Sequence, residues 1–114
     1  MAYSEELAIR LRDYFSTNGI VFEEKKMMGG LCFMVDDKMC VGINKDDLML
    51  RTDPAIYENL LTKDGCRPMD FTGRPMKGFV FVEEAAVEKQ SELKSWVDLA
   101  LEFNPRAKSS KKRG

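Results

Sequence analysis

The chain has 114 residues, of which 44% are hydrophobic and 32% charged. This length and composition predict one globular domain and exclude an intrinsically disordered protein. No apolar run approaches the roughly 18 residues that a membrane span needs. The first residues also lack the basic end and apolar stretch of a signal peptide. We therefore expect a cytoplasmic protein that has no membrane association.

Histidine is absent, which excludes the usual general base near neutral pH and the commonest transition-metal ligand. The three cysteines, Cys32, Cys40 and Cys66, form no CxxC pair and no zinc spacing, and their odd number predicts reduced thiols. Cys32 and Cys40 lie in apolar runs, where cysteine is usually a buried filler. Cys66 follows Gly65 in a predicted loop, so we expect it to be the most exposed thiol. No catalytic residue, metal or cofactor is expected.

Charge is distributed unevenly along the chain. Residues 106–114 carry five cations and no acid, whereas residues 1–105 carry thirteen cations against nineteen acids. Such a basic end is usually disordered, and a nucleic-acid-binding arm is the alternative. The acidic body disfavours a broad phosphate-binding surface. We therefore divide the chain into a domain over residues 1–105 and a basic disordered tail over residues 106–114.

The first predicted element is a helix that begins after Ser4, a favourable N-cap, and ends at Asn18-Gly19. Its buried face follows the helical spacing of Leu7, Leu11, Tyr14 and Phe15. A strand is expected to open at residues 20–22 and to break down in the charged residues 23–26.

Two apolar runs, residues 31–35 and 39–43, are joined by Asp36-Asp37-Lys38, which predicts a tight hairpin. With a two-residue turn, Phe33 faces Cys40 and Cys32 points to the other side, so these cysteines cannot pair. Alternation divides the hairpin into two apolar faces: Cys32, Met34, Met39, Val41 and Ile43 against Leu31, Phe33, Val35 and Cys40. One face must meet helices, and we expect the other to be a subunit interface or a ligand surface.

The later elements complete an α+β pattern. Residues 48–51 extend the hairpin to an antiparallel meander, and Asp53-Pro54 begins a short amphipathic helix. A strand follows at residues 78–82 and a last helix at about residues 91–103. The order α-β-β-β-β-α-β-α predicts an antiparallel sheet of about four meander strands plus one later strand. Its helices are expected mainly on one face.

The least ordinary stretch is RPMDFTGRPMKGFVFV, residues 67–82. Pro68 and Pro75 fix the backbone and hold the arginine before each of them extended. Gly73 permits a turn, and Gly78 suggests a bulge or a close backbone approach where the strand begins. We interpret these four residues as the frame of a rigid corner.

The same stretch carries three cations, Arg67, Arg74 and Lys77, with Asp70 among them. One interpretation is structural: Asp70 or other acids of the chain pair with these cations. The other is that the four residues bind a ligand or partner, for example an anion such as a phosphate or carboxylate. The sequence leaves both interpretations open.

The segments MMGGLCFMVDDKMCVGI, LMLRTDP, RPMDFTGRPMKGFVFV and LKSWVDLALEFN resemble the TfoX (Sxy) N-terminal domain family over about residues 4–105. The resemblance implies an α+β domain like the type III secretion chaperones, often dimeric and without established enzymatic activity. In full-length members, which regulate bacterial natural competence, a second helical domain follows. Those proteins act with a cyclic-AMP-responsive transcription activator. We expect this chain to be a stand-alone single-domain member.

The leading hypothesis is a non-enzymatic regulatory or protein-interaction domain that is linked to transcription regulation and forms a homodimer. Direct nucleic-acid binding through Arg67, Arg74, Lys77 and the basic tail is one alternative. A small anionic-ligand binder or enzyme that uses the same cations is another.

Overall fold

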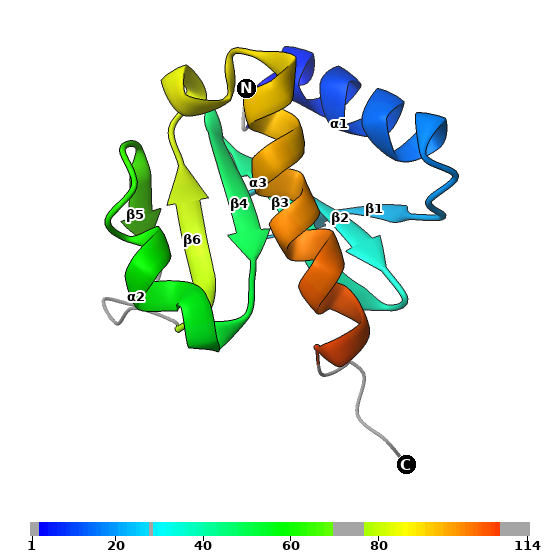
Figure 1. Ribbon diagram of the computed structural model, residues 1–114. Helices are drawn as coiled ribbons and strands as arrows, with labels where there is room; N and C mark the ends of the chain where they lie inside the picture. Colours follow the sequence, from blue (N-terminus) through cyan, green and yellow to red (C-terminus); the bar gives the residue numbers. More distant parts are fainter. Residues whose placement is uncertain (1–2, 28, 70–76, 108–114) are drawn as a thin grey trace.

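The computed structural model describes residues 3–27, 29–69 and 77–107. Within these ranges a six-stranded sheet is covered on one side by three α-helices (Figure 1). The strands are β1 (Glu23–Met27), β2 (Gly30–Val35), β3 (Lys38–Asn44), β4 (Asp47–Arg51), β5 (Cys66–Pro68) and β6 (Phe79–Val82). The helices are α1 (Glu5–Thr17), α2 (Tyr57–Leu60) and α3 (Gln90–Phe103), with short 3₁₀ turns η1 (Pro54–Ile56), η2 (Glu84–Val87) and η3 (Asn104–Arg106). The predicted α+β class is confirmed.

The strands are antiparallel throughout, in the order β1-β2-β3-β4-β6-β5. β1 to β4 form the predicted meander, and β6 is the later strand. β5 adds an element that the sequence pattern did not predict, and it pairs with β6 so that Arg67 lies opposite Phe81. No helix in the described part of the chain combines the length and apolar character needed to cross a bilayer.

The first strand lies later in the chain than its apolar content suggests. Residues 20–22 are not a strand, and β1 is the charged segment Glu23–Met27. β1 pairs only with β2, so its outer edge faces solvent and its charged side chains stay hydrated. Arg12 of α1 holds this strand through two hydrogen bonds to the Glu24 carboxylate, at 2.6 and 2.9 Å.

The turn between β2 and β3 is formed by Asp36 and Asp37, which have φ angles of 56° and 62°. Two successive left-handed residues define the type I′ turn that matches strand twist. The register then shifts, because Phe33 pairs with Val41 rather than with Cys40. Cys40 is therefore the extra residue of a β-bulge, and the predicted Phe33–Cys40 pairing is wrong.

The bulge changes which side chains of β3 meet the helices. Val41 and Ile43 belong to the helix-side core together with Phe33, whereas strict alternation had assigned them to the opposite face. Cys32 lies in the cluster on the far side of the sheet, and Cys40 lies in the helix-side core. The prediction that these two cysteines cannot pair is confirmed, since all three thiols are free.

The far side of the sheet carries a second, sulfur-rich cluster of Cys32, Met34, Met39, Met49, Met69 and Phe81. Cys32, Met34 and Met39 are at most 5% exposed. The expectation that this hairpin face forms an open interface or ligand surface is therefore wrong. Arg51 and Arg67 lie over the rings of Phe79 and Phe81, at 5.4 and 5.2 Å from the ring centroids, and cover part of this side.

α1 is placed by its caps and by an aromatic cluster. Ser4 Oγ accepts a hydrogen bond from Leu7 N at 3.2 Å, as the N-cap prediction requires. The Phe15 ring packs against Phe22 and Phe33, with centroid separations of 5.3 and 5.7 Å. Phe22 thus contributes to the core from the segment before β1, which explains its apolar character without a strand.

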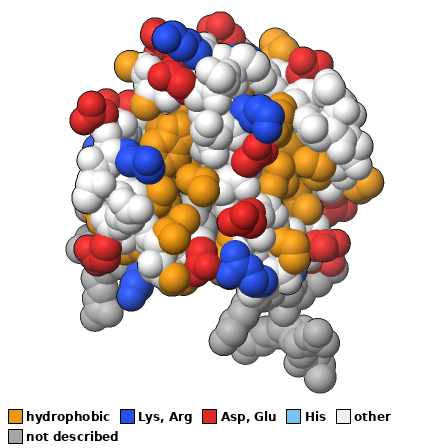
Figure 2. Space-filling model, in the orientation of Figure 1, with side chains coloured by type: hydrophobic (Ala, Val, Ile, Leu, Met, Phe, Trp, Pro, Cys, Tyr) orange, Lys and Arg blue, Asp and Glu red, His pale blue; other side chains and the backbone are white. Residues whose placement is uncertain are grey.

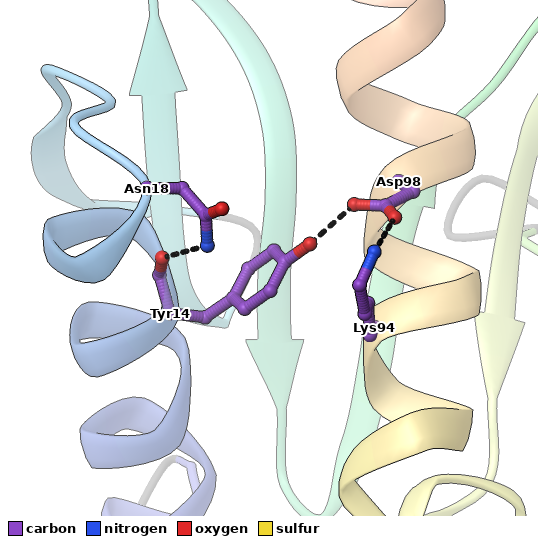
Figure 3. Close-up of polar contacts among 4 residues, drawn as sticks. All are labelled: Tyr14, Asn18, Lys94 and Asp98. Atoms are coloured by element: carbon purple, nitrogen blue, oxygen red, sulfur yellow. Dashed lines mark hydrogen bonds and ion pairs between the residues drawn. The ribbon is translucent and has the colours of Figure 1, made fainter.

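The two flanks of α3 differ. Apolar surface is visible on both sides of this helix in Figure 2. On the α1 side, Tyr14 Oη donates to Asp98 Oδ1 at 2.5 Å, and Lys94 Nζ binds the other carboxylate oxygen at 2.7 Å (Figure 3). These contacts connect α1 with α3. The flank toward α2 has no such bridge within the described residues.

α3 is also fixed at its end. Asn104 is buried, and its side-chain amide donates to Val35 O at 3.2 Å, while its own carbonyl accepts from Lys38 Nζ at 3.0 Å. The 3₁₀ turn η3 is also fixed, by an ion pair in which Arg106 Nη1 lies 2.8 Å from Asp53 Oδ2. Asp53 is the N-cap of η1, and hydrogen bonds from the Ala55 amide and from Arg106 lower the pKa of its carboxyl.

The start of β6 depends on a glycine. Gly78 has φ +93°, and a Cβ there would lie 2.9 Å from Thr52 O. The Gly78 carbonyl accepts from both Thr52 N and Thr52 Oγ1, at 2.7 and 2.9 Å. The close backbone approach predicted for Gly78 is confirmed.

We expect Gly78→Ala to lower the free energy of unfolding by about 2–3 kcal/mol, because strain at positive φ adds to the clash with Thr52. Gly19→Ala is the matched control, since Gly19 also has positive φ but nothing lies within 4 Å of its added Cβ. Its loss should be about 1 kcal/mol. Urea denaturation measures both variants, and equal losses would contradict the close approach.

We expect Tyr14→Phe to cost about 1 kcal/mol at neutral pH by urea denaturation, because it removes the bond to Asp98. Partial burial by itself opposes ionisation of Asp98, but the bonds from Lys94 and Tyr14 outweigh it and lower the pKa of Asp98 below its ordinary value. The stabilisation is therefore present above the unfolded pKa and lost as pH falls through the folded one. The difference between wild type and variant should shrink below about pH 4, whereas a pH-independent difference would contradict the bond.

Tyr3→Phe is the control for the same measurement. Tyr3 is also partly buried, but its hydroxyl makes no hydrogen bond with the described residues. Its loss of stability should be small and should not change with pH.

Candidate functional site

The residues proposed from the RPMDFTGRPMKG stretch are only partly described. Arg67 and Pro68 lie in β5, and Lys77 and Gly78 lie immediately before β6. The remaining four, Asp70, Gly73, Arg74 and Pro75, lie outside the described residues. A combined site of Arg67, Asp70, Arg74 and Lys77 therefore stays a prediction.

Arg67 is engaged by the chain itself. Its Nη2 donates to Asp47 Oδ2 at 2.6 Å, and its Nε lies 3.9 Å from Glu83 Oε1. The guanidinium also lies 5.2 Å from the centroid of the Phe81 ring. These contacts join β5 to β4 and β6, so they favour the structural interpretation of Arg67 over recognition of a phosphate. Lys77 is exposed and makes no ion pair with the described residues.

All three thiols are buried. Cys66 is buried at the start of β5 but, at 9% exposed against 0% and 1% for Cys32 and Cys40, it is the most exposed thiol, as predicted. Burial raises the pKa of Cys66 to about 11, although Lys63 and Arg67 act in the opposite direction. Burial also raises the pKa of Cys32 to about 11 and that of Cys40 to about 12. A thiol at neutral pH is then protonated and a poor nucleophile.

A concave surface lies between α2, η2 and α3, on the flank of α3 away from α1. It has a volume of about 790 Å³, within the range of typical ligand pockets. We call it the α2–α3 groove. Its apolar floor consists of Ile56, Leu60, Ala86, Trp96 and Leu99. Figure 2 shows apolar side chains along this flank of α3, open to solvent on the helical side of the molecule.

The local sequence explains why this floor is only partly covered. Leu60 and Trp96 are buried in the core, and Trp96 keeps 8% of its surface accessible at the groove. Leu99 follows Trp96 by three residues, so both side chains point to the same flank of α3. α2 has only four residues, which leaves much of this flank uncovered.

The rim of the groove is mainly acidic. Asp64, Glu83 and Glu92 line it together with a single cation, Lys63. Glu83 N donates to the carbonyl of Gly65 at 2.8 Å, and Gly65 directly follows Asp64. Asp64 and Glu83 therefore lie on adjoining segments at one end of the groove. Glu92 accepts from Lys89 N at 3.2 Å and belongs to α3. The arrangement can shield apolar groups from water while its carboxylates remain hydrated.

Sequence reasoning did not find this groove. It predicted the short helix after Asp53-Pro54 and the last helix, but gave Leu99 no role. The available signal was Leu99 itself, an additional apolar residue beside the buried stripe of α3. Within residues 3–27, 29–69 and 77–107, no group of three or more His, Cys, Asp or Glu side chains could hold a metal ion.

Comparison with known families gives one match. The family model for the TfoX N-terminal domain matches residues 9–104. The chain belongs to the TfoX N-terminal domain family. Comparison with curated proteins and with solved structures gave no match. The resemblance of the four quoted segments to TfoX is thus confirmed, whereas the likeness to secretion chaperones stays a prediction.

We expect all three thiols of this TfoX-family domain to resist modification in the native state at pH 8, because each is buried and protonated. Ellman's reagent measures the rate, and the same protein in about 6 M guanidinium chloride should release three equivalents at once. One rapidly reacting equivalent in the native protein would contradict the burial of Cys66. Loss of that rapid equivalent in Cys66→Ser would then identify Cys66 as the reacting thiol.

Proposed function

We propose that this TfoX-family chain is a non-enzymatic regulatory domain that acts by binding a protein partner and is linked to transcription regulation. Family membership supports the regulatory part of the proposal. The α2–α3 groove supports the binding part, and it is the single observation that carries the proposal. Concave surfaces with an apolar lining and a few polar groups at their edge are typical binding sites.

The contacts of Arg67 bear on the alternatives. Nucleic-acid binding and anion binding both include Arg67 among their cations, and its guanidinium is held by Asp47 and Glu83. The groove also has an acidic rim, which repels phosphate. These observations favour a protein partner over a polyanion.

Self-association is a separate part of the proposal. The sequence argument for a homodimer used the second apolar face of the β2–β3 hairpin, and that face is buried within one chain. The homodimer therefore rests on the family resemblance alone and stays a prediction.

Leu99→Glu is expected to abolish the regulatory effect, because it places a charge on the apolar floor of the groove. Leu99 is only partly buried, so the fold should tolerate the change. The measurement compares transcript levels in source cells that lack the chain with those in the same cells supplied with wild type or variant. Wild type should restore the transcripts that deletion changes, and Leu99→Glu should not.

Ile9→Glu is the matched control, because Ile9 is 61% exposed on α1 and does not line the groove. It should restore transcripts as wild type does. If Leu99→Glu restores them equally well at equal protein level, the groove does not carry the function. If deletion itself changes no transcript, the link to transcription is wrong.

A further inference from the structure

We propose that the α2–α3 groove binds the apolar face of a short amphipathic helix that carries Lys or Arg beside that face. This inference rests on the proposed function and names the chemistry of its partner. It depends on three features of the groove: its length, its floor and the sign of its rim.

The length of the groove fits about two helical turns. On the α3 side it is lined from Glu92 to Leu99, a rise of about 10 Å along a helix axis. η1 and α2 form the opposite side, where Ile56 and Leu60 contribute to the floor and Lys63 lies beyond them in the chain. A helix lying between two helical walls presents apolar side chains at i, i+3, i+4 and i+7, which is a common mode of peptide recognition.

The floor supplies an aromatic anchor. Trp96 is held by the core and exposes 8% of its surface, with Leu99 beside it and Ala86 on the η2 side. A tryptophan already fixed by packing loses little conformational freedom on binding, and such residues dominate the binding energy of interfaces. Ala86 is small, so side chains of a partner can approach the backbone of η2 there.

The rim selects for cations. Asp64, Glu83 and Glu92 lie around the floor against Lys63 alone. Asp64 makes no ion pair with the described residues, and Glu83 shares only a 3.9 Å contact with Arg67. Carboxylates without a close ion pair attract a basic partner and disfavour an acidic one.

A second copy of the chain does not offer such a helix. Among the described residues the large apolar side chains that are well exposed are Ile9 and Val21. Ile9 is a single residue on α1, and Val21 lies outside the helices. The described helices α1 and α3 direct their apolar stripes into the core of the chain, which favours another protein as the occupant.

A direct test uses a synthetic helical peptide of about 14 residues. Leucines occupy i, i+3, i+4 and i+7, lysines flank them, and alanine and glutamine fill the rest. Trp96, the one tryptophan of the chain, reports binding through its fluorescence because the peptide contains none. Two control peptides have the leucines scrambled or each lysine replaced by glutamate. We expect saturable binding of the basic peptide and at least ten-fold weaker binding of both controls.

Variants of the whole chain locate the binding site. Leu99→Glu should weaken the basic peptide at least ten-fold, and Ile9→Glu should leave its affinity unchanged. Ser95→Arg is the second groove variant: Ser95 is exposed on the α3 wall, so arginine there blocks the groove without entering the core. Asp64→Lys should weaken the basic peptide and improve the acidic one. Circular dichroism and urea denaturation confirm that each variant is folded.

Several results would overturn the proposal. The first is an unchanged Trp96 emission up to about 1 mM basic peptide. The second is equal binding of the acidic or scrambled peptide. The third is an unchanged affinity of the folded Ser95→Arg variant for the basic peptide. Failure here can be separated from failure of the proposed function. If Leu99→Glu abolishes regulation in cells while the peptide does not bind, the function stands and the occupant is wrong. If the peptide binds and deletion changes no transcript, the link to transcription regulation fails instead.

Discussion

The extra residue that β3 accommodates at Cys40 determines how the rest of the molecule packs. Side chains alternate along a strand, so a shift of one residue exchanges the two faces. The bulge sends Val41 and Ile43 toward the helices and Gly42 toward the far side. Gly42 suits that position, because a Cβ there would lie 2.8 Å from Met49 Cε and 3.3 Å from Cys32 Sγ. Both layers therefore depend on this irregularity in the middle of the sheet.

The helix-side layer built on this register is asymmetric, and the asymmetry produces the groove. One flank of α3 is connected with α1 through Tyr14 and Asp98, and its end is held to the β2–β3 hairpin through Asn104. The other flank meets the four-residue α2 and a 3₁₀ turn, which are too short to cover Leu99 and the edge of Trp96. A longer second helix would close the same surface. The α2–α3 groove is thus left open because the segment between β4 and β5 forms only short helical turns.

Sequence reasoning recovered what local chemistry decides. The cap at Ser4, the Asp53-Pro54 helix start, the turn at Asp36-Asp37 and the last helix are fixed by neighbouring residues, and all were predicted. β1 was placed a few residues too early and β5 was missed, because pairing with a neighbour, rather than their own composition, makes them strands.

The bulge at Cys40 and the burial of Cys66 were missed for a similar reason, since both depend on contacts from distant parts of the chain. The groove was missed because periodicity shows which helix face is apolar but not how much of that face another element covers. Of the four residues predicted to frame the RPMDFTGRPMKG corner, Pro68 and Gly78 lie within the described residues.

The two edges of the sheet restrict how the molecule can meet other chains. One edge is β1, where Glu23, Glu24, Lys25 and Lys26 follow one another, and the other is β5, where Pro68 has no amide hydrogen to donate. An incoming strand would have to desolvate four charges at one edge and accept a missing hydrogen bond at the other. Growth of the sheet by addition of further strands, the usual route to fibrous assemblies, is therefore disfavoured at both ends. Contacts with other chains through side chains are therefore favoured over contacts through the backbone of the sheet.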